Sequence, residues 1–117
     1  MSDEFLRVAA AEINEELQNI EETLRQCNSD SDVTIHCKKI EGHFHKIKGL
    51  APMMGKTRVG KIAEGMDVHL KEIISGKTVN GIFSILNDSN DFMKNEMKEE
   101  TSGYEELEDK IKNLNST

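Results

Sequence analysis

The sequence predicts an all-α protein, an up-and-down antiparallel four-helix bundle with a short fifth C-terminal helix. Three observations favour this fold class. The length of 117 residues suits a single domain. Apolar residues recur every three or four positions in successive segments, which is the helical period. Leu, Ile, Val and Phe make up 28 of the 117 residues and Trp is absent, so the core is expected to be aliphatic.

The apolar period predicts five helices, over residues 4–27, 32–54, 58–75, 80–98 and 103–114, in one domain spanning residues 1–117. The connections between them are short, so sequential helices are expected to be antiparallel. The polar run 28–32 is typical of a turn and N-cap before the second helix, and Asn80 is the expected cap of the fourth. Pro52 lacks an amide hydrogen, so it is expected to kink or loosen the last turn of the second helix.

The charge of the chain limits the classes of protein it can be. A net charge of −7 excludes a chain that is basic throughout, as nucleic-acid binders usually are. No apolar run approaches the length of a membrane span, the polar N-terminus does not resemble a secretion signal, and two cysteines make no disulfide framework. We therefore expect a cytoplasmic protein with neither nucleic acid nor membrane as a partner.

The average charge hides a basic middle. Residues 38–77 contain nine Lys and Arg residues but only four Asp and Glu residues, so this stretch is positive while the rest of the chain is strongly acidic. A basic stretch in an acidic protein is either a solvated face or a docking surface for an acidic partner.

One histidine in this stretch occupies an unusual helical position. On a helical wheel of the second helix, His36 and His43 lie at the edge of the apolar stripe, whereas His45 faces solvent. Two glycines, Gly42 and Gly49, lie one turn before and after His45, although glycine is costly within a helix. Without side chains, they leave room around the imidazole for another surface.

An exposed imidazole beside a cation suits nucleophilic attack on a phosphoryl group, because a neutral ring nitrogen is available near neutral pH. Lys48, one turn after His45, can offset the added negative charge. A carboxylate at the other ring nitrogen would fix the tautomer. Asp67 is a candidate, because it follows core residue Met66 as His45 follows Phe44, and Glu64 is the other.

The run from His45 to Gly55, HKIKGLAPMMG, resembles the motif of histidine-containing phosphotransfer (HPt) domains, most closely the N-terminal phosphotransfer domain of the chemotaxis histidine kinase CheA. The resemblance implies that His45 is the phosphoacceptor, at Nε2, with Lys48 beside the phosphoryl group. It places Asp67 where the family usually has a glutamate bonded to the histidine Nδ1, and Glu64 where it often has a second histidine. Both residues, and Pro52, are departures from the family pattern.

The chain has no Gly-rich nucleotide loop and is too short for a kinase domain, so we expect a phosphocarrier without an ATP site or cofactor. It could stand alone or be the phosphoacceptor domain of a CheA-type histidine kinase. The chemistry of the family places Mg²⁺ in the partners, so no metal is expected in this chain. Its expected partners are an ATP-binding histidine kinase domain and a response-regulator receiver domain, whose acidic site would be attracted by the basic stretch. We expect a monomer. The expected docking residues are Gly42, Gly49, Lys46, Pro52 and Lys56.

Two alternatives remain open at this point. A phosphorylation-inactive helical adaptor could dock on a kinase or receiver, and the departures at Asp67 and Glu64 are its support. A metal- or redox-responsive bundle would use Cys27, His36, Cys37 and His43, but their spacing matches no usual zinc pattern and packing at the core boundary is favoured.

Overall fold

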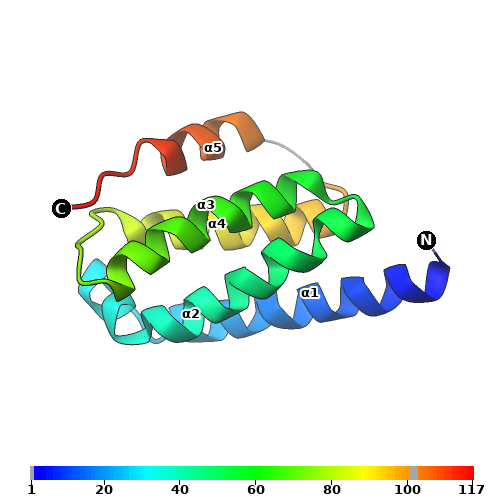
Figure 1. Cartoon of the computed structure of the whole chain (residues 1–117), viewed down its shortest axis with the longest axis horizontal. Coiled ribbons are helices and arrows are strands. Elements are labelled where there is room, and N and C mark those ends of the chain that lie inside the picture. The colour runs from blue at the N-terminus through cyan, green and yellow to red at the C-terminus, as the bar shows by residue number, and fades with distance from the viewer. Residues whose placement is uncertain (1, 101–102) are drawn as a thin grey trace.

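The computed structural model describes residues 2–100 and 103–117, and this part of the chain is all-helical, as the sequence predicts (Figure 1). All five predicted helices are present. The elements are α1 (Asp3–Leu24), α2 (Asp30–Leu50), a 3₁₀-helix η1 (Pro52–Met54), α3 (Thr57–Ile74), α4 (Ile82–Met97) and α5 (Tyr104–Lys112). The predicted ends differ from the observed ones, most of all for α2, which was expected to continue to residue 54.

The core is aliphatic and is built from the predicted apolar stripes. On α1 the stripe residues Ile13, Leu17 and Ile20 are buried. The stripe on α2 and its C-cap is also buried, and consists of Val33, Cys37, Ile40, Phe44, Ile47 and Ala51. α3 and α4 contribute the same kinds of side chain, with Met66 and Met93 among the fully buried ones. Burial of these faces is the main favourable term for folding, because each aliphatic side chain removed from water contributes roughly 1.5–3 kcal/mol.

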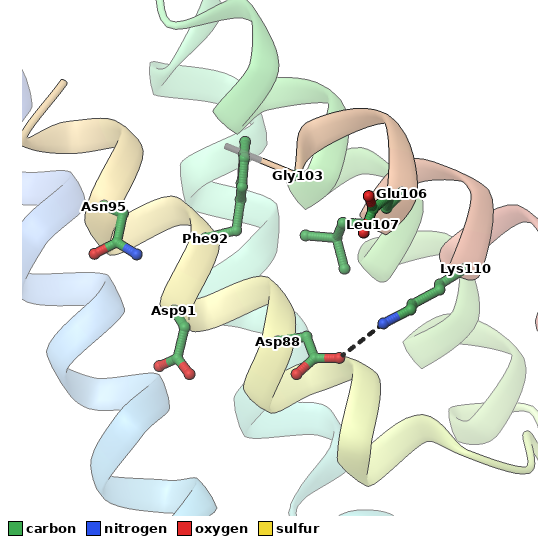
Figure 2. Close-up of a pocket in the computed structure, with 8 residues that line it drawn as sticks. All are labelled: Asp88, Asp91, Phe92, Asn95, Gly103, Glu106, Leu107 and Lys110. Atoms are coloured by element: carbon green, nitrogen blue, oxygen red, sulfur yellow. Dashed lines mark ion pairs between the residues drawn. The ribbon is translucent and has the colours of Figure 1, made fainter. Parts of the chain in front are cut away.

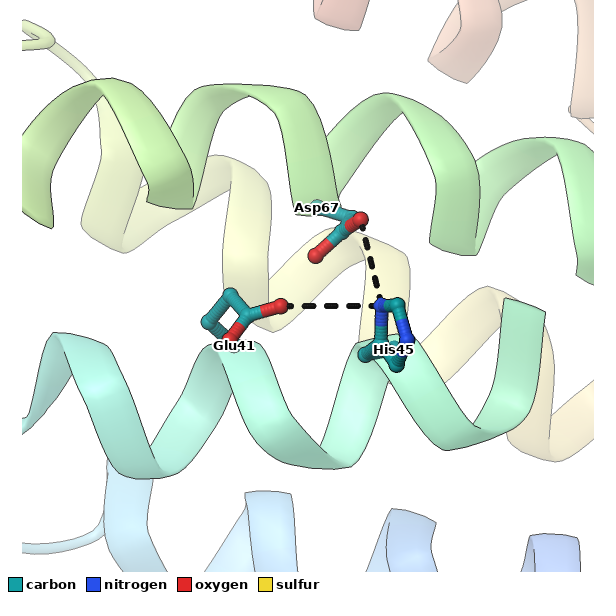
Figure 3. A group of neighbouring side chains, drawn as sticks. All are labelled: Glu41, His45 and Asp67. Carbon is teal, nitrogen blue, oxygen red and sulfur yellow. Dashed lines mark ion pairs between the residues drawn. The ribbon is translucent and has the colours of Figure 1, made fainter. Parts of the chain in front are cut away.

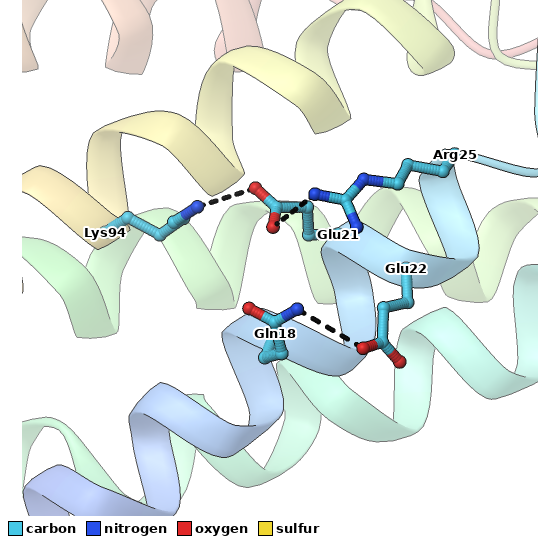
Figure 4. Close-up of polar contacts among 5 residues, drawn as sticks. All are labelled: Gln18, Glu21, Glu22, Arg25 and Lys94. Carbon is cyan, nitrogen blue, oxygen red and sulfur yellow. Dashed lines mark hydrogen bonds and ion pairs between the residues drawn. The ribbon is translucent and has the colours of Figure 1, made fainter.

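Each of the five α-helices packs against at least two others. α2 lies against both α1 and α3, α4 packs against α1 and α3, and α5 rests on α3 and α4, on the side away from α1 (Figure 1). An ion pair fastens α1 to α4, since Lys94 Nζ lies 2.6 Å from Glu21 Oε1, and Arg25 pairs with the same carboxylate (Figure 4). None of the described helices has a stretch apolar and long enough to cross a lipid bilayer.

The second helix ends earlier than predicted because of Pro52. Ala51 still donates its amide to the Ile47 carbonyl, but proline has no amide hydrogen to continue the ladder. The chain tightens into η1 and leaves it at Gly55, whose φ of 79° is the left-handed conformation that favours glycine. The expected disturbance at Pro52 is therefore a complete break, and the ring packs against α3, where a Cβ on Gly60 would meet Pro52 Cγ at 3.0 Å.

The start of α4 corrects another prediction. Asn80 does not cap this helix. The helix begins at Ile82, directly after Gly81, and no side chain next to it in the sequence caps its N-terminus. The carboxylate of Asp30, in the first turn of α2, accepts the amides of Gly81 at 2.9 Å and Phe83 at 2.8 Å. A carboxylate is favourable at a helix N-terminus, so one aspartate links the starts of two helices. The predicted cap of α2 itself is confirmed, since the Ser29 hydroxyl accepts the Asp32 amide.

α5 is held on α3 by a close approach and by His69. A Cβ on Gly65 would lie 2.9 Å from Ile111 Cγ2, so this glycine makes room for α5. His69 Nε2 donates to the Ile111 carbonyl at 2.9 Å, while its Nδ1 lies 2.9 Å from Glu72 Oε1. The C-terminal segment continues the contact through backbone bonds between Thr78 and Thr117.

Candidate functional site

His45 projects from α2 into solvent, as the helical wheel predicts. It lies between the buried side chains Phe44 and Ile47, yet 59% of its own side chain is exposed. Its Nδ1 edge faces Glu41 on the same helix and Asp67 on α3, and the other ring nitrogen lies on the opposite edge of the ring (Figure 3). One edge of the imidazole therefore faces two carboxylates, and the other edge is open.

Asp67 lies beside His45, as expected from its position after Met66, but it is far more buried than a solvated helix residue. Only 2% of its side chain is exposed. Its Oδ2 lies 2.9 Å from Lys48 Nζ and 3.0 Å from Lys71 Nζ, and 3.7 Å from His45 Nδ1. The predicted neighbours His45, Lys48 and Asp67 are thus brought together, with the aspartate bound most closely by the two lysines.

Two further residues belong to this cluster, and the sequence did not assign them a role. Glu41, one turn before His45, places Oε2 3.8 Å from His45 Nδ1. Lys71, one turn after Asp67 on α3, is the second cation on that carboxylate. The i,i+4 spacing of each pair was a usable signal, because side chains four apart lie on one helix face.

Neither carboxylate makes a hydrogen bond to His45 in this arrangement. Distances of 3.7 and 3.8 Å to Nδ1 exceed the usual 2.7–3.2 Å range for a nitrogen donor. The two acceptors flank the ring nitrogen almost equally. The site therefore contains an imidazole with two alternative acceptors and no fixed partner.

The charges of the cluster are strongly interdependent. Burial raises the pKa of Asp67, but hydrogen bonding from Glu41, Lys48 and Lys71 outweighs burial and holds this pKa well below its ordinary value. Contact with Asp67, followed by burial, raises the pKa of Glu41. Asp67 Oδ1 is buried and has no hydrogen-bond partner among the described residues, so both lysines contact this carboxylate through Oδ2.

The cluster has ligand types that bind metal ions, but its lysines oppose one. Glu41, His45 and Asp67 each offer an atom within 4.8 Å of the others, the only such group of three among the described residues. The ammonium groups of Lys48 and Lys71 already neutralise Asp67, and a dication beside them would be repelled. Cys27 and Cys37 are buried free thiols and do not gather with His36 and His43 into a ligand set within residues 2–100 and 103–117.

Glu64 lies apart from the cluster. Its side chain is exposed and borders a groove between α3 and α5, together with Lys61 and Glu108. No hydrogen bond or ion pair joins it to His45 within the described part of the chain. The pKa of Lys48 is raised mainly by its hydrogen bond to Asp67. Glu64 affects the site only through its negative charge, which adds to this rise.

The expected docking residues differ in how free they are. Gly42 and Gly49 are open, since a Cβ at either would meet nothing within 4 Å. Lys46 is 65% exposed and lies 3.7 Å from Glu16 on α1. Lys56 instead donates to the Glu96 carbonyl at 3.3 Å, which ties the start of α3 to the end of α4. Pro52 is exposed, although its ring also packs on Gly60.

His43 provides an internal contrast to His45. Its side chain is 15% exposed, and Nδ1 lies 2.8 Å from Glu16 Oε1, within the contact between α1 and α2. Its Nε2 is buried. A phosphoryl donor could not reach His43 without disturbing the packing, so only one of these two neighbouring histidines presents an accessible nitrogen.

A separate groove of about 260 Å³ lies between α4 and α5 (Figure 2). It is lined by the acidic residues Asp88, Asp91 and Glu106, and Lys110 Nζ approaches Asp88 Oδ2 at 3.9 Å. None of the predicted site residues lines it. The groove is thus distinct from the His45 cluster.

Comparison of the chain with family models, with curated proteins and with solved structures finds no match. The resemblance to HPt domains stated above therefore rests on the sequence motif from His45 to Gly55 and stays a prediction.

Proposed function

We propose that this chain is a histidine phosphotransfer module of a two-component, chemotaxis-like signalling system. The His45 Nε2 lone pair attacks the γ-phosphorus of ATP bound to a CheA-type kinase domain, the bond from phosphorus to the ADP oxygen breaks, and ADP leaves. A receiver aspartate then attacks the same phosphorus, the P–N bond breaks, and the imidazole is regenerated. The chain supplies the positioned nucleophile and its partners supply the nucleotide and metal sites.

One observation carries the proposal. The imidazole of His45 is exposed, with its Nδ1 edge toward two carboxylates and its other edge open. It lies between two glycines around which there is unfilled space. The protein's packing does not require Gly42 or Gly49, since a Cβ at either position would meet nothing within 4 Å. Each glycine nevertheless lowers helix stability by about 1 kcal/mol relative to alanine. A partner that must approach His45 closely accounts for this cost.

Lys48 is placed to serve the phosphorylated state. Its side chain is 32% exposed, and its Nζ is bound to Asp67 Oδ2 before the reaction. A phosphoryl group on His45 adds roughly two negative charges, to which the long lysine side chain can turn. Lys71 remains on Asp67, so that buried carboxylate keeps one cation when Lys48 leaves.

The proposal includes the finer expectations from the sequence. The four long helices form an up-and-down antiparallel bundle with α5 as the short fifth helix, and the module acts as a cytoplasmic monomer without a bound metal. The basic stretch steers the open face of His45 toward acidic receiver sites, so association weakens as salt concentration rises.

The test is phosphorylation by CheA-type kinase domains with labelled ATP. Wild-type protein is expected to acquire acid-labile label, and His45→Gln is expected to remain unlabelled with an unchanged fold, because the side chain is exposed. His43→Gln is the matched control and should label as wild type does. An unlabelled wild type, or a labelled His45→Gln, would exclude the carrier function.

The alternative is a phosphorylation-inactive adaptor that docks on a kinase or receiver domain. The observation that favours it is the state of Asp67, which binds two lysines and lies 3.7 Å from His45 Nδ1 rather than hydrogen-bonded to it. The adaptor predicts binding of kinase or receiver without labelling, equal in wild type and His45→Gln. The same assay, read together with binding, therefore separates the two functions.

A further inference from the structure

Either Glu41 or Asp67 could accept a hydrogen bond from His45 Nδ1, and the carboxylate with fewer other contacts is better able to do so. Asp67 Oδ2 already receives the ammonium groups of Lys48 and Lys71 at 2.9 and 3.0 Å. Its other oxygen, Oδ1, is fully buried. Asp67 cannot move toward the imidazole without loosening both ion pairs and leaving its buried position.

Glu41 has none of these restraints. Its side chain is 19% exposed, and among the described residues its carboxylate is paired with no lysine or arginine. It shares a helix face with His45, with the acid on the N-terminal side, the favourable order for an i,i+4 pair of opposite charge. A shift of about 1 Å in a flexible glutamate side chain would bring Oε2 from 3.8 Å into hydrogen-bonding range of Nδ1.

We propose that Glu41 is the positioning residue of this site: its carboxylate accepts the Nδ1–H of His45 and thereby leaves the lone pair on Nε2. Asp67 then has a different task, which is to hold Lys48 and Lys71 close to His45. This assignment rests on the proposed function for its purpose, since an Nε2 lone pair is what phosphoryl transfer needs. The tautomer itself is a property of the unphosphorylated chain.

The groups around Glu41 are consistent with this assignment. Those that face it within the described residues are His45 on its own helix, and Asp67 and Lys71 on α3. Asp67 disfavours the ionised form of Glu41, while Lys71 and His45 favour it. The measurement is therefore made at pH 8, well above the ordinary pKa of a glutamate, to favour the ionised form of Glu41.

The experiment reads the tautomer of His45 in the unphosphorylated full chain, from the ¹⁵N shifts of its two ring nitrogens at pH 8. Wild type is expected to hold the proton mainly on Nδ1. In Glu41→Met, which keeps the length but removes the acceptor, this preference should be lost. Glu41→Gln, whose amide oxygen can still accept, should restore it, and Glu64→Met, an exposed glutamate on α3, is the matched control with a wild-type spectrum.

Two results would overturn the assignment. One is a Glu41→Met spectrum equal to that of wild type, and the other is loss of the Nδ1 proton preference in Asp67→Asn alone. Kinase-dependent labelling of Glu41→Met is expected to be slower by about tenfold, by analogy with residues that orient the histidine ligands of metal sites. Because the tautomer is read without any phosphoryl donor, this inference can fail while phosphotransfer stands, and phosphotransfer can fail while the tautomer effect stands.

Discussion

Lys48 Nζ lies 2.9 Å from Asp67 Oδ2, so the cation expected beside a phosphoryl group is bound, in the unmodified protein, to the carboxylate expected beside the imidazole. The same oxygen lies 3.0 Å from Nζ of Lys71, which is one turn after Asp67 on α3. One buried carboxylate thus keeps two lysines close to one exposed histidine. Removing the members of this cluster one at a time should separate their roles.

Lys48 and Lys71 form a natural pair of variants. Each contacts Asp67 Oδ2 at nearly the same distance, so Lys48→Met and Lys71→Met should both lower the free energy of unfolding slightly and to a similar extent. Only Lys48 is one turn from His45 on the same helix, so Lys48→Met should slow labelling by the kinase more than Lys71→Met does. Equal rates for the two variants would contradict the role given to Lys48.

Asp67→Ala should destabilise the fold more than either lysine variant. It removes the shared partner of two cations from a buried position, although both lysines can turn to solvent, so we expect a loss of about 1–3 kcal/mol in denaturant unfolding. Glu64→Ala is the control, and should change stability by less than about 0.5 kcal/mol because this side chain is exposed and unpaired with the site. A neutral effect of Asp67→Ala would show that the lysine contacts do not stabilise the protein.

The glycines next to His45 give opposite effects on stability and docking. Gly42→Ala and Gly49→Ala should each raise the free energy of unfolding by up to about 1 kcal/mol, because the added methyl group meets nothing and alanine favours the helix. Labelling by a kinase domain should slow, whereas reaction with a small phosphoryl donor should not. Gly65→Ala is the contrast: its Cβ would lie 2.9 Å from Ile111 Cγ2, so it should destabilise the packing of α5. Unchanged kinase rates in the first two variants would remove the case for close approach.

Glu41 should make stability depend on pH in the opposite direction from Asp67. The pKa of Glu41 is raised in the folded state, so its contribution is fully present below the unfolded pKa and is lost as pH rises through the folded pKa. The pKa of Asp67 is lowered, so its contribution is present above the unfolded pKa and is lost as pH falls. In unfolding series from pH 3 to 8, Glu41→Gln should therefore gain stability relative to wild type as pH rises. A difference that stays constant with pH would mean that Glu41 is not perturbed by folding.

The sequence predicted the helices well where an apolar period decides the outcome, and less well where a distant residue does. The stripe around Phe44 and Ile47 placed both residues in the core and His45 outside it, because helical geometry alone sets these directions. The cap of α4 could not be predicted from its own neighbours. It comes from Asp30, more than fifty positions earlier in the chain, and depends on how α2 meets α4.

The proximity of His45 and Asp67 could be predicted from the sequence, but their other contacts could not. The neighbourhood of His45 and Asp67 followed from the core residues that precede each of them, whereas the burial of Asp67 depends on how closely α2 and α3 pack. Glu41 was visible four positions before His45, but its importance depends on Asp67 Oδ2 being occupied by two lysines. That competition depends on how α2 and α3 meet in the fold and has no signature in the residue spacing of one helix.

The most direct test of the central claim is the reaction of the purified full chain with phosphoramidate, a small phosphoryl donor that needs no docking surface. The modified nitrogen is identified by ³¹P and long-range ¹H–¹⁵N spectra. We predict a single phosphohistidine, at Nε2 of His45, and no phosphohistidine in His45→Gln. A phosphoryl group on His36, His43 or His69, or an unmodified His45, would contradict the account.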